Sequence, residues 1–415
     1  MFKIDSELLK EYAKLAVELG VNVQPGQPLE IRTPVEAYEL ARECAKVAYE
    51  KGASKVIVEY DDEPRTRMNY EYMSEENLAK VPNWQLDKIQ ENIDSGYCRL
   101  FISGSNPDLL NGIDPKKIQN VSIARMNATK KFQYYSMNNV GQWSIVAYPE
   151  INWAHKVFPD IKDDDEAMNA LWDAILMTSR VELGKTVDNW NKHNAEIKEH
   201  SKKLNDYNFK SLHFKNSLGT DLTVGLIKDH IWEGGCDVSR GQYKCLFNPN
   251  IPTEEVFTMP DRYHIDGKVY STKPLSYNGN VIPSFNLTFK DGKVVDYDAE
   301  VNKEILKNLL ETDEGSTSLG EVALISYDSP ISNSGILFYD TLFDENASCH
   351  LALGACYPTN LKGGTELSED ELYERGGNKS MEHCDFMFGS KDMHIVGTTY
   401  DGEEIVVFDS GNFVI

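Results

Sequence analysis

The chain has 415 residues, 41% of them hydrophobic and 26% charged, which is typical of globular protein and leaves room for two or three domains. Its 42 basic and 66 acidic side chains give a net charge of 42 − 66 = −24, which argues against a nucleic-acid or anionic-membrane partner. No stretch reaches the roughly 18 apolar residues of a membrane span.

The expected setting of the protein is the cytoplasm. The N-terminal residues MFKIDSELLKEYAKLAVELG mix Lys with Glu and lack the apolar core of a signal peptide. The seven cysteines are odd in number and contain no C-x-x-C pair, so they predict neither a disulfide framework nor a structural zinc finger. A reducing compartment fits this cysteine usage.

The N-terminal half alternates helical and strand patterns. A helix is expected from Ser6 to Leu19, with Ser6 as its cap, followed by a short strand in PLEIRT. The spacing from Pro34 to Gly52 predicts a second helix, and SKVIVEY reads as a buried strand. Further buried strands are expected in CRLFISGS and WSIVAYP, with helices between them. This order predicts an α/β domain with a largely parallel sheet.

A long helical pattern from Asp163 to Leu204 contains the predicted domain junction. Its second part is mostly polar, as in helices that bridge domains. We therefore expect an N-terminal α/β domain at residues 1–190 and a C-terminal domain at residues 191–415.

Short strands dominate beyond Asn205. SLHFKNSLGTDLTVGL has a turn at Asn216 to Gly219, and FNLTFKDGKVVDYDAE has Asp291-Gly292 between two alternating runs, a strong hairpin signal. A helix is expected from Val301 to Thr312 and a buried strand in LGEVALIS. The C-terminal domain is predicted to be α+β with mostly antiparallel sheet.

Candidate metal ligands gather between Asp344 and Gly389. The segments DENASCHLALGACYP and MEHCDFMFG bring carboxylates and imidazoles together, a mixture that suits Zn, Co or Mn better than an all-oxygen Ca or Mg site. If HCDFMFG is a strand, side chains two residues apart leave the same face. The residues concerned are Glu345, His350, Tyr357, His383 and Asp385.

Two further carboxylates fit such a site. Glu321 lies in the buried strand LGEVALIS, where an unpaired charge is unfavourable and a metal ion would offset it. Glu254 and Glu255 follow each other in NIPTEEVFTMPDR, so one faces in and one out. Spacing alone leaves open which of the two faces the interior.

IPTEEVFTMPDR, SLGEVALIS, FDENASCHLALGACYP and EHCDFMFG, in this order, resemble the aminopeptidase T, aminopeptidase S and PepS family of two-metal exopeptidases. The resemblance covers the whole chain. It implies an N-terminal α/β domain, a metal-bearing C-terminal domain and a homodimer enclosing an inner cavity. It assigns metal binding to Glu255, Glu321, His350, His383 and Asp385, with Glu345 as a further ligand or a group directly behind the ligands.

The resemblance also implies the reaction. Two divalent ions, Zn, Co or Mn with Mg also compatible, would activate a water that hydrolyses N-terminal residues from peptides with a free N-terminus. Glu321 is expected to bridge the ions, and either Glu321 or Glu345 takes the proton of the water. Tyr357 is expected to be catalytic, as a hydrogen-bond donor to the oxyanion.

Other readings of the same residues stay open on the sequence alone. A different two-metal hydrolase, such as an amidase or phosphoesterase, would use the same ligand types. A metal-binding domain without turnover is the alternative from another class. Cys349 and Cys384 adjoin candidate histidines, but neighbours on a strand point to opposite faces, which argues against a Cys–His nucleophile pair.

Overall fold

In the computed structural model, residues 2, 4–277 and 280–415 are described. The chain forms two compact units, the first comprising residues 1–194 and 236–252 and the second residues 195–235 and 253–415. The segment 236–252 therefore belongs to the first unit, although it falls within the C-terminal range expected from the sequence. Among the described helices, none has both the length and the apolar character that crossing a membrane requires.

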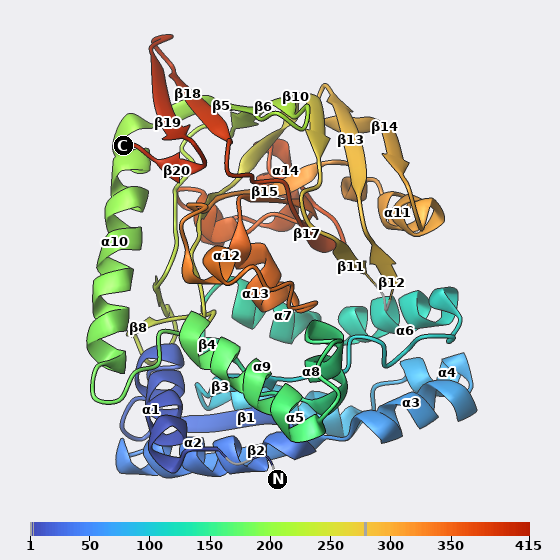
Figure 1. The fold of residues 1–415 in the computed structure, drawn as a ribbon, viewed down its shortest axis with the longest axis vertical. Helices are drawn as coiled ribbons and strands as arrows, with labels where there is room; N and C mark the ends of the chain where they lie inside the picture. The colour runs from blue at the N-terminus through green and yellow to red at the C-terminus, as the bar shows by residue number, and fades with distance from the viewer. Residues whose placement is uncertain (1, 3, 278–279) are drawn as a thin grey trace. The chain divides into compact units, whose positions relative to one another are not determined.

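A four-stranded parallel sheet forms the centre of the first unit (Figure 1). Its strands pair in the order β2-β1-β3-β4, every pair parallel, as the βαβ pattern predicted. The strands are β1 (Pro28–Pro34), β2 (Lys55–Asp61), β3 (Cys98–Ser103) and β4 (Trp143–Ala147). The α-helices are α1 (Ser6–Lys14), α2 (Tyr38–Glu50), α3 (Glu63–Tyr72), α4 (Glu75–Ala79), α5 (Asn83–Asp94), α6 (Pro115–Ala128), α7 (Lys130–Met137), α8 (Ile151–Val157) and α9 (Asp164–Thr178).

The first helix begins at Ser6 as expected, but its N-cap is the preceding residue, Asp5. The side chain of Asp5, not Ser6, accepts hydrogen bonds from the backbone N–H groups of Glu7 and Leu8. Ser6 is the first helical residue, and a π-helical turn, Leu15–Gly20, continues the helix. Both residue types are good N-caps, so the sequence alone did not separate them.

The segment 236–252 joins the first unit through the edge of its sheet. The N–H of Ile145 in β4 donates to Pro249 O at 2.7 Å, and the N–H of Ile251 donates to Ile145 O at 3.0 Å. The same segment contains a short antiparallel pair, β7 (Asp237–Val238) and β8 (Leu246–Phe247). Pairing between residues about 100 positions apart has no local signal in the sequence.

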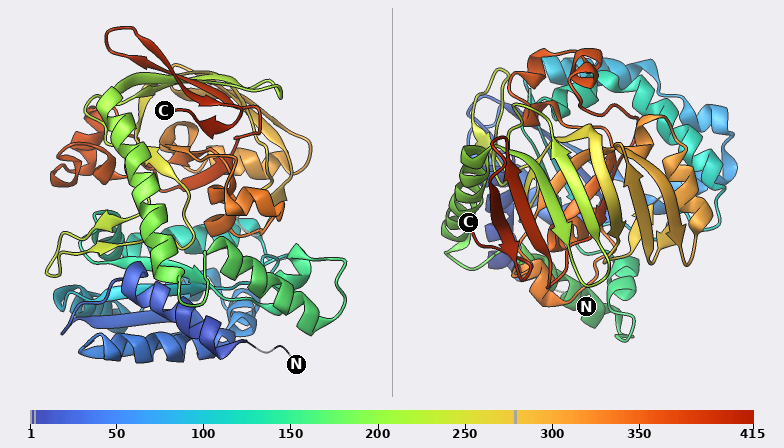
Figure 2. Two further views of the ribbon diagram at one scale, coloured as in Figure 1. Left: turned by 60° about the vertical axis from the view of Figure 1, so that its left-hand side comes forward. Right: turned by 90° about the horizontal axis from the view of Figure 1, so that it is seen from above.

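An eight-stranded antiparallel sheet dominates the second unit (Figure 2). Its order is β14-β13-β10-β6-β5-β18-β19-β20. The strands are β5 (Phe209–Lys215), β6 (Asp221–Leu226), β10 (Pro260–Tyr270), β13 (Phe285–Lys290), β14 (Lys293–Ala299), β18 (His394–Thr399), β19 (Glu404–Asp409) and β20 (Asn412–Phe413). The two predicted hairpins are both present, as β5–β6 and β13–β14.

A second, four-stranded antiparallel sheet of this unit has the order β17-β16-β15-β9. Its strands are β9 (Val256–Thr258), β15 (Leu319–Leu324), β16 (His350–Gly354) and β17 (His383–Met387). A further antiparallel pair consists of β11 (Leu275–Tyr277) and β12 (Asn280–Ile282), and the α-helices are α11 (Lys303–Leu310), α12 (Pro330–Ser334), α13 (Thr341–Asp344) and α14 (Glu369–Glu374). Helix α10 (Thr186–Tyr207) runs from the first unit into the second.

The core of the second unit lies between its two sheets. Phe214 of the large sheet meets Phe388 at the end of β17 with ring centroids 5.2 Å apart, and Phe285 of β13 meets Phe386 of β17 at 5.5 Å. From the small sheet, alternate residues enter this core: Val256, Val322, Leu324, Leu351, Leu353, Cys384 and Phe386. The residues between them therefore face the other side of the small sheet.

Candidate metal centre

The predicted ligands lie on the face of the four-stranded sheet opposite the core, because each of them is one residue along its strand from a core residue. Glu321 in β15 precedes the core residue Val322, and Asp385 in β17 follows Cys384. Glu321 pairs with Ala352 of β16, which in turn pairs with Asp385, so the two carboxylates lie in one row across the sheet. The small Ala352 side chain between them leaves room on this face.

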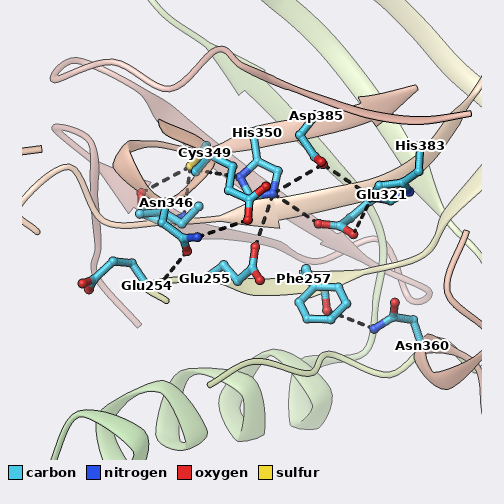
Figure 3. A network of polar contacts seen from close by, with 12 residues as sticks. Glu254, Glu255, Phe257, Glu321, Asn346, Cys349, His350, Asn360, His383 and Asp385 are labelled. Atoms are coloured by element: carbon cyan, nitrogen blue, oxygen red, sulfur yellow. Dashed lines mark hydrogen bonds and ion pairs between the residues drawn. The ribbon is translucent and has the colours of Figure 1, made fainter. Parts of the chain in front are cut away.

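Glu255 joins the same face from the residue just before β9. The side chain of Asn346, fully buried, accepts a hydrogen bond from Glu254 N at 2.8 Å and donates to Leu342 O at 3.0 Å, which fixes the backbone at this point. Figure 3 shows Glu254 turned away from the cluster and Glu255 turned into it. Glu255 is therefore the glutamate that faces the cluster, which the spacing in the sequence left open.

Two histidines complete the cluster (Figure 3). His350 Nε2 lies 3.2 Å from Glu321 Oε1 and 3.3 Å from Glu255 Oε2. His383 Nε2 lies 3.6 Å from Glu321 Oε2 and 3.5 Å from Asp385 Oδ1. Each oxygen of Glu321 therefore faces a different histidine.

The backbone sets the orientation of both imidazoles. His350 Nδ1 lies 2.9 Å from Glu345 O, and His383 Nδ1 lies 2.7 Å from Ala355 O. A carbonyl can only accept, so each Nδ1 carries the hydrogen and each Nε2 points at the carboxylates. A ring nitrogen held in this way is typical of a metal-ligating histidine.

Burial and like charges perturb the acids of the cluster. Burial raises the pKa of Glu321, and the charge of Asp385 adds to this, although the hydrogen bond with His350 opposes it. Burial and the charges of Asp385 and Glu255 raise the pKa of Glu345 well above its usual value. Negative charge is therefore in excess where Glu255, Glu321, Glu345 and Asp385 meet.

Protons on the histidines balance part of that charge in the metal-free protein. Burial opposes charge on His350, but its hydrogen bonds with Glu255 and Glu321, together with the charges of Glu255 and Asp385, raise its pKa well above the usual value. For His383, burial also opposes the charge, but the charge and hydrogen bond of Asp385 and the charge of Glu321 together raise the pKa to about 9. A divalent cation would take the place of these protons, because metal binding requires neutral imidazole.

The donor set fits metal ions. Within the described part of the chain, two groups of side chains place one ligand atom each within 4.8 Å of one another. Asp385 Oδ1 is buried and makes no hydrogen bond to any described residue, so it has acceptor capacity left for a cation. The two groups are Glu255, Glu321 and His350, and Glu321, His383 and Asp385.

Glu345 and Tyr357 lie beside these groups and belong to neither. Asn346 Nδ2 donates to Glu345 Oε1 at 3.4 Å. The ring of Tyr357 packs edge-on against His383, with centroids 4.9 Å apart, and against Phe257 at 6.0 Å. Burial, followed by the charges of Glu321, Asp385 and Glu345, raises the pKa of Tyr357 well above its usual value, so the phenol keeps its proton.

Charged residues at and after the end of β2 have local partners. Asp61 at the end of β2 pairs with Arg32 at 2.8 Å, and Asp62 caps α3 by accepting from Arg65 N. Arg67 donates to Glu71 at 2.8 Å. A single Asn beside a candidate ligand carries no distinctive pattern, so the sequence does not indicate the role of Asn346.

Carboxylates and imidazoles gathered in this way fit a metal-dependent enzyme. Residues 5–413 match the family model described as thermophilic metalloprotease (M29), and the chain belongs to this family. The predicted resemblance and the predicted class of enzyme are thereby confirmed.

Named relatives extend over nearly the whole chain. Aminopeptidase 2 of Geobacillus stearothermophilus is 45% identical over 405 residues, covering 98% of this chain and 97% of its own length. Aminopeptidase AmpS of Bacillus subtilis is 44% identical over 408 residues, covering 98% of each chain. The solved structure of wild-type AmpT from Thermus thermophilus matches with a TM-score of 0.90 at 38% identity, covering 98% of this chain and 99% of that one.

Proposed function

We propose that this metal-dependent aminopeptidase holds two divalent ions, one at Glu255, Glu321 and His350 and the other at Glu321, His383 and Asp385. The observation that carries the proposal is that Glu321 is the carboxylate common to both groups and directs one oxygen to each histidine. A shared carboxylate is what a pair of ions about 3.5–4 Å apart requires. Carboxylate and imidazole ligands without thiolates favour Zn, Co or Mn.

When bound, such a pair of ions supplies a water of lowered pKa, polarises the scissile carbonyl and holds the α-amine of the peptide. The chain supplies the rest. Glu345, a carboxylate next to both groups but in neither, accepts the proton of the attacking water. Tyr357 donates its phenolic hydrogen to the carbonyl oxygen as negative charge develops on it.

The substrates follow from the family. Its relatives are named aminopeptidases, so we expect peptides with a free N-terminus to be hydrolysed one residue at a time. A homodimer with an enclosed cavity is proposed from the resemblance stated above, and it would exclude long folded substrates. A cytoplasmic setting is proposed because the seven cysteines are odd in number and contain no C-x-x-C pair.

The test is hydrolysis of Leu-, Arg- and Tyr-arylamides before chelation, after chelation and after re-addition of Zn, Co or Mn. N-acetylated arylamides serve as the matched control for the free amine. We expect activity to disappear with the metal, to return with it, and to be absent on acetylated substrates. Full activity of protein shown by metal analysis to be free of ions would refute the proposal, and equal rates on acetylated substrates would refute the exopeptidase specificity.

A further inference from the structure

The side chain of Asn360 is a buried polar group to which the chemistry above gives no task. Asn360 is 1% exposed and ends the short 3-10 turn Pro358–Asn360, which directly follows Tyr357. Its backbone N–H donates to Tyr357 O at 3.1 Å, and its carbonyl accepts from Ile231 N at 2.7 Å. The residue therefore closes the turn that begins at Tyr357.

The amide group of Asn360 reaches two other segments of the same unit. Its Nδ2 lies 3.3 Å from Ile231 O, 3.4 Å from Phe257 O and 3.4 Å from Glu233 Oε2. Figure 3 shows the contact with Phe257, on the sheet face that carries the ligands. Each of these hydrogen bonds is long, but together they join the turn to strand β9 and to residues 231–233.

Strand β9 in turn contacts Tyr357 itself. Phe257 of β9 meets the ring of Tyr357 edge-on at 69°, and His383 meets that ring from another side at the same angle. Asn360 thus links the backbone of the Tyr357 turn to strand β9 by a hydrogen bond, and Phe257 of the same strand packs against the Tyr357 ring. Loss of the Asn360 amide would allow the Tyr357 ring to move relative to β9, while every candidate metal ligand stays unchanged.

We propose that Asn360 is a positioning residue that holds the Tyr357 hydroxyl where it donates to the reacting carbonyl oxygen. The inference rests on the role proposed above for Tyr357. Displacing a reacting group by about 1 Å lowers the rate on the order of 10²-fold. Because Asn360 acts through the Tyr357 hydroxyl, its substitution cannot lower the rate more than removal of that hydroxyl does. A purely structural Asn360 would instead change stability and leave kcat in place.

The first experiment compares Asn360→Ala and Asn360→Ser with Asn205→Ala. Asn205 is a matched control, because its amide also clamps the segment 231–233, donating to Trp232 O at 3.0 Å and accepting from Trp232 N at 2.9 Å, but it does not contact the turn of Tyr357. We expect kcat of both Asn360 variants to fall about 10–10²-fold with KM and bound metal little changed. Asn205→Ala should lower the melting temperature and leave kcat unchanged.

The second experiment repeats Asn360→Ala in a Tyr357→Phe background, as a double-mutant cycle. If Asn360 acts through the hydroxyl, the substitution should lower kcat by less than about threefold there. The same loss in both backgrounds, with Tyr357→Phe itself slow, would overturn the inference and leave the proposed function standing. A fully active Tyr357→Phe enzyme would overturn the role of Tyr357 and the inference together. Failure of both Asn360 variants to fold, while Asn205→Ala folds, would assign Asn360 to stability and refute the proposal.

Discussion

Substitution of Glu321 by Gln separates a bridging carboxylate from an ordinary ligand. The substitution keeps the volume of the side chain but removes its negative charge and replaces one of its two oxygens by an NH2 group, which donates hydrogen bonds and does not bind a cation. In the structure Oε1 lies 3.2 Å from His350 Nε2 and Oε2 lies 3.6 Å from His383 Nε2. One change therefore reaches both proposed ion positions.

The size of the effect follows from that sharing. Loss of a group that merely orients a ligand weakens metal binding by about 10–100-fold. A direct ligand lost from two ions should therefore weaken binding of the pair by at least about 10²–10⁴-fold, or about 2.7–5.4 kcal/mol at about 1.36 kcal/mol per tenfold change. Glu255→Gln and Asp385→Asn are the matched controls, because each residue belongs to only one of the two groups.

The assay is metal content per chain after dialysis at a fixed concentration of free metal, measured together with kcat. We expect Glu255→Gln and Asp385→Asn each to keep about one ion and Glu321→Gln to keep almost none, with kcat at least about 10²-fold lower. The melting temperature of metal-free Glu321→Gln should not fall, because a buried charge among like charges is removed. If Glu321→Gln retained as much metal as either control, the bridging role would be wrong.

Three further predictions concern other parts of the molecule. Tyr357→Phe should lower kcat about 10²–10³-fold with KM, metal content and stability nearly unchanged; a near-normal kcat would make the tyrosine a packing residue. The net charge of −24 should attract cationic peptides, so rates on Arg- or Lys-leading substrates should fall with added salt while rates on Leu-leading ones hold, and salt-independent rates would remove steering from the account. Burial raises the pKa of Glu63 to about 7. Because this lies above the unfolded value of about 4.3, its contribution lowers stability as the pH rises from about 4 to about 7. Glu63→Gln should therefore raise the melting temperature more at pH 8 than at pH 4. An equal change at both pH values would contradict the raised pKa of Glu63.

Local patterns in the sequence predicted much of the fold. The alternation in HCDFM placed His383 and Asp385 on one face of a strand, and the structure has them on one face of β17. The Asp291-Gly292 pair predicted the β13–β14 hairpin, where both residues have positive φ, at 50° and 83°. Signals of this kind survive because they depend on neighbours in the chain.

The pairing of strands far apart in the chain could not be predicted from the sequence. Nothing local indicates that β5 pairs with β18, or that residues 249–251 return to β4. The same holds at the site, where the inward turn of Glu255 depends on Asn346, about 90 residues further along the chain. The candidate ligands could be predicted from their residue types, whereas the residues that orient them could not.

The most direct test of the central claim is anomalous diffraction from crystals of the metal-loaded protein, measured at the absorption edge of the bound metal. We expect two peaks per chain about 3.5–4 Å apart, one beside His350 and Glu255, the other beside His383 and Asp385, with Glu321 contacting both. A single peak, or two peaks of which only one contacts Glu321, would contradict the claim.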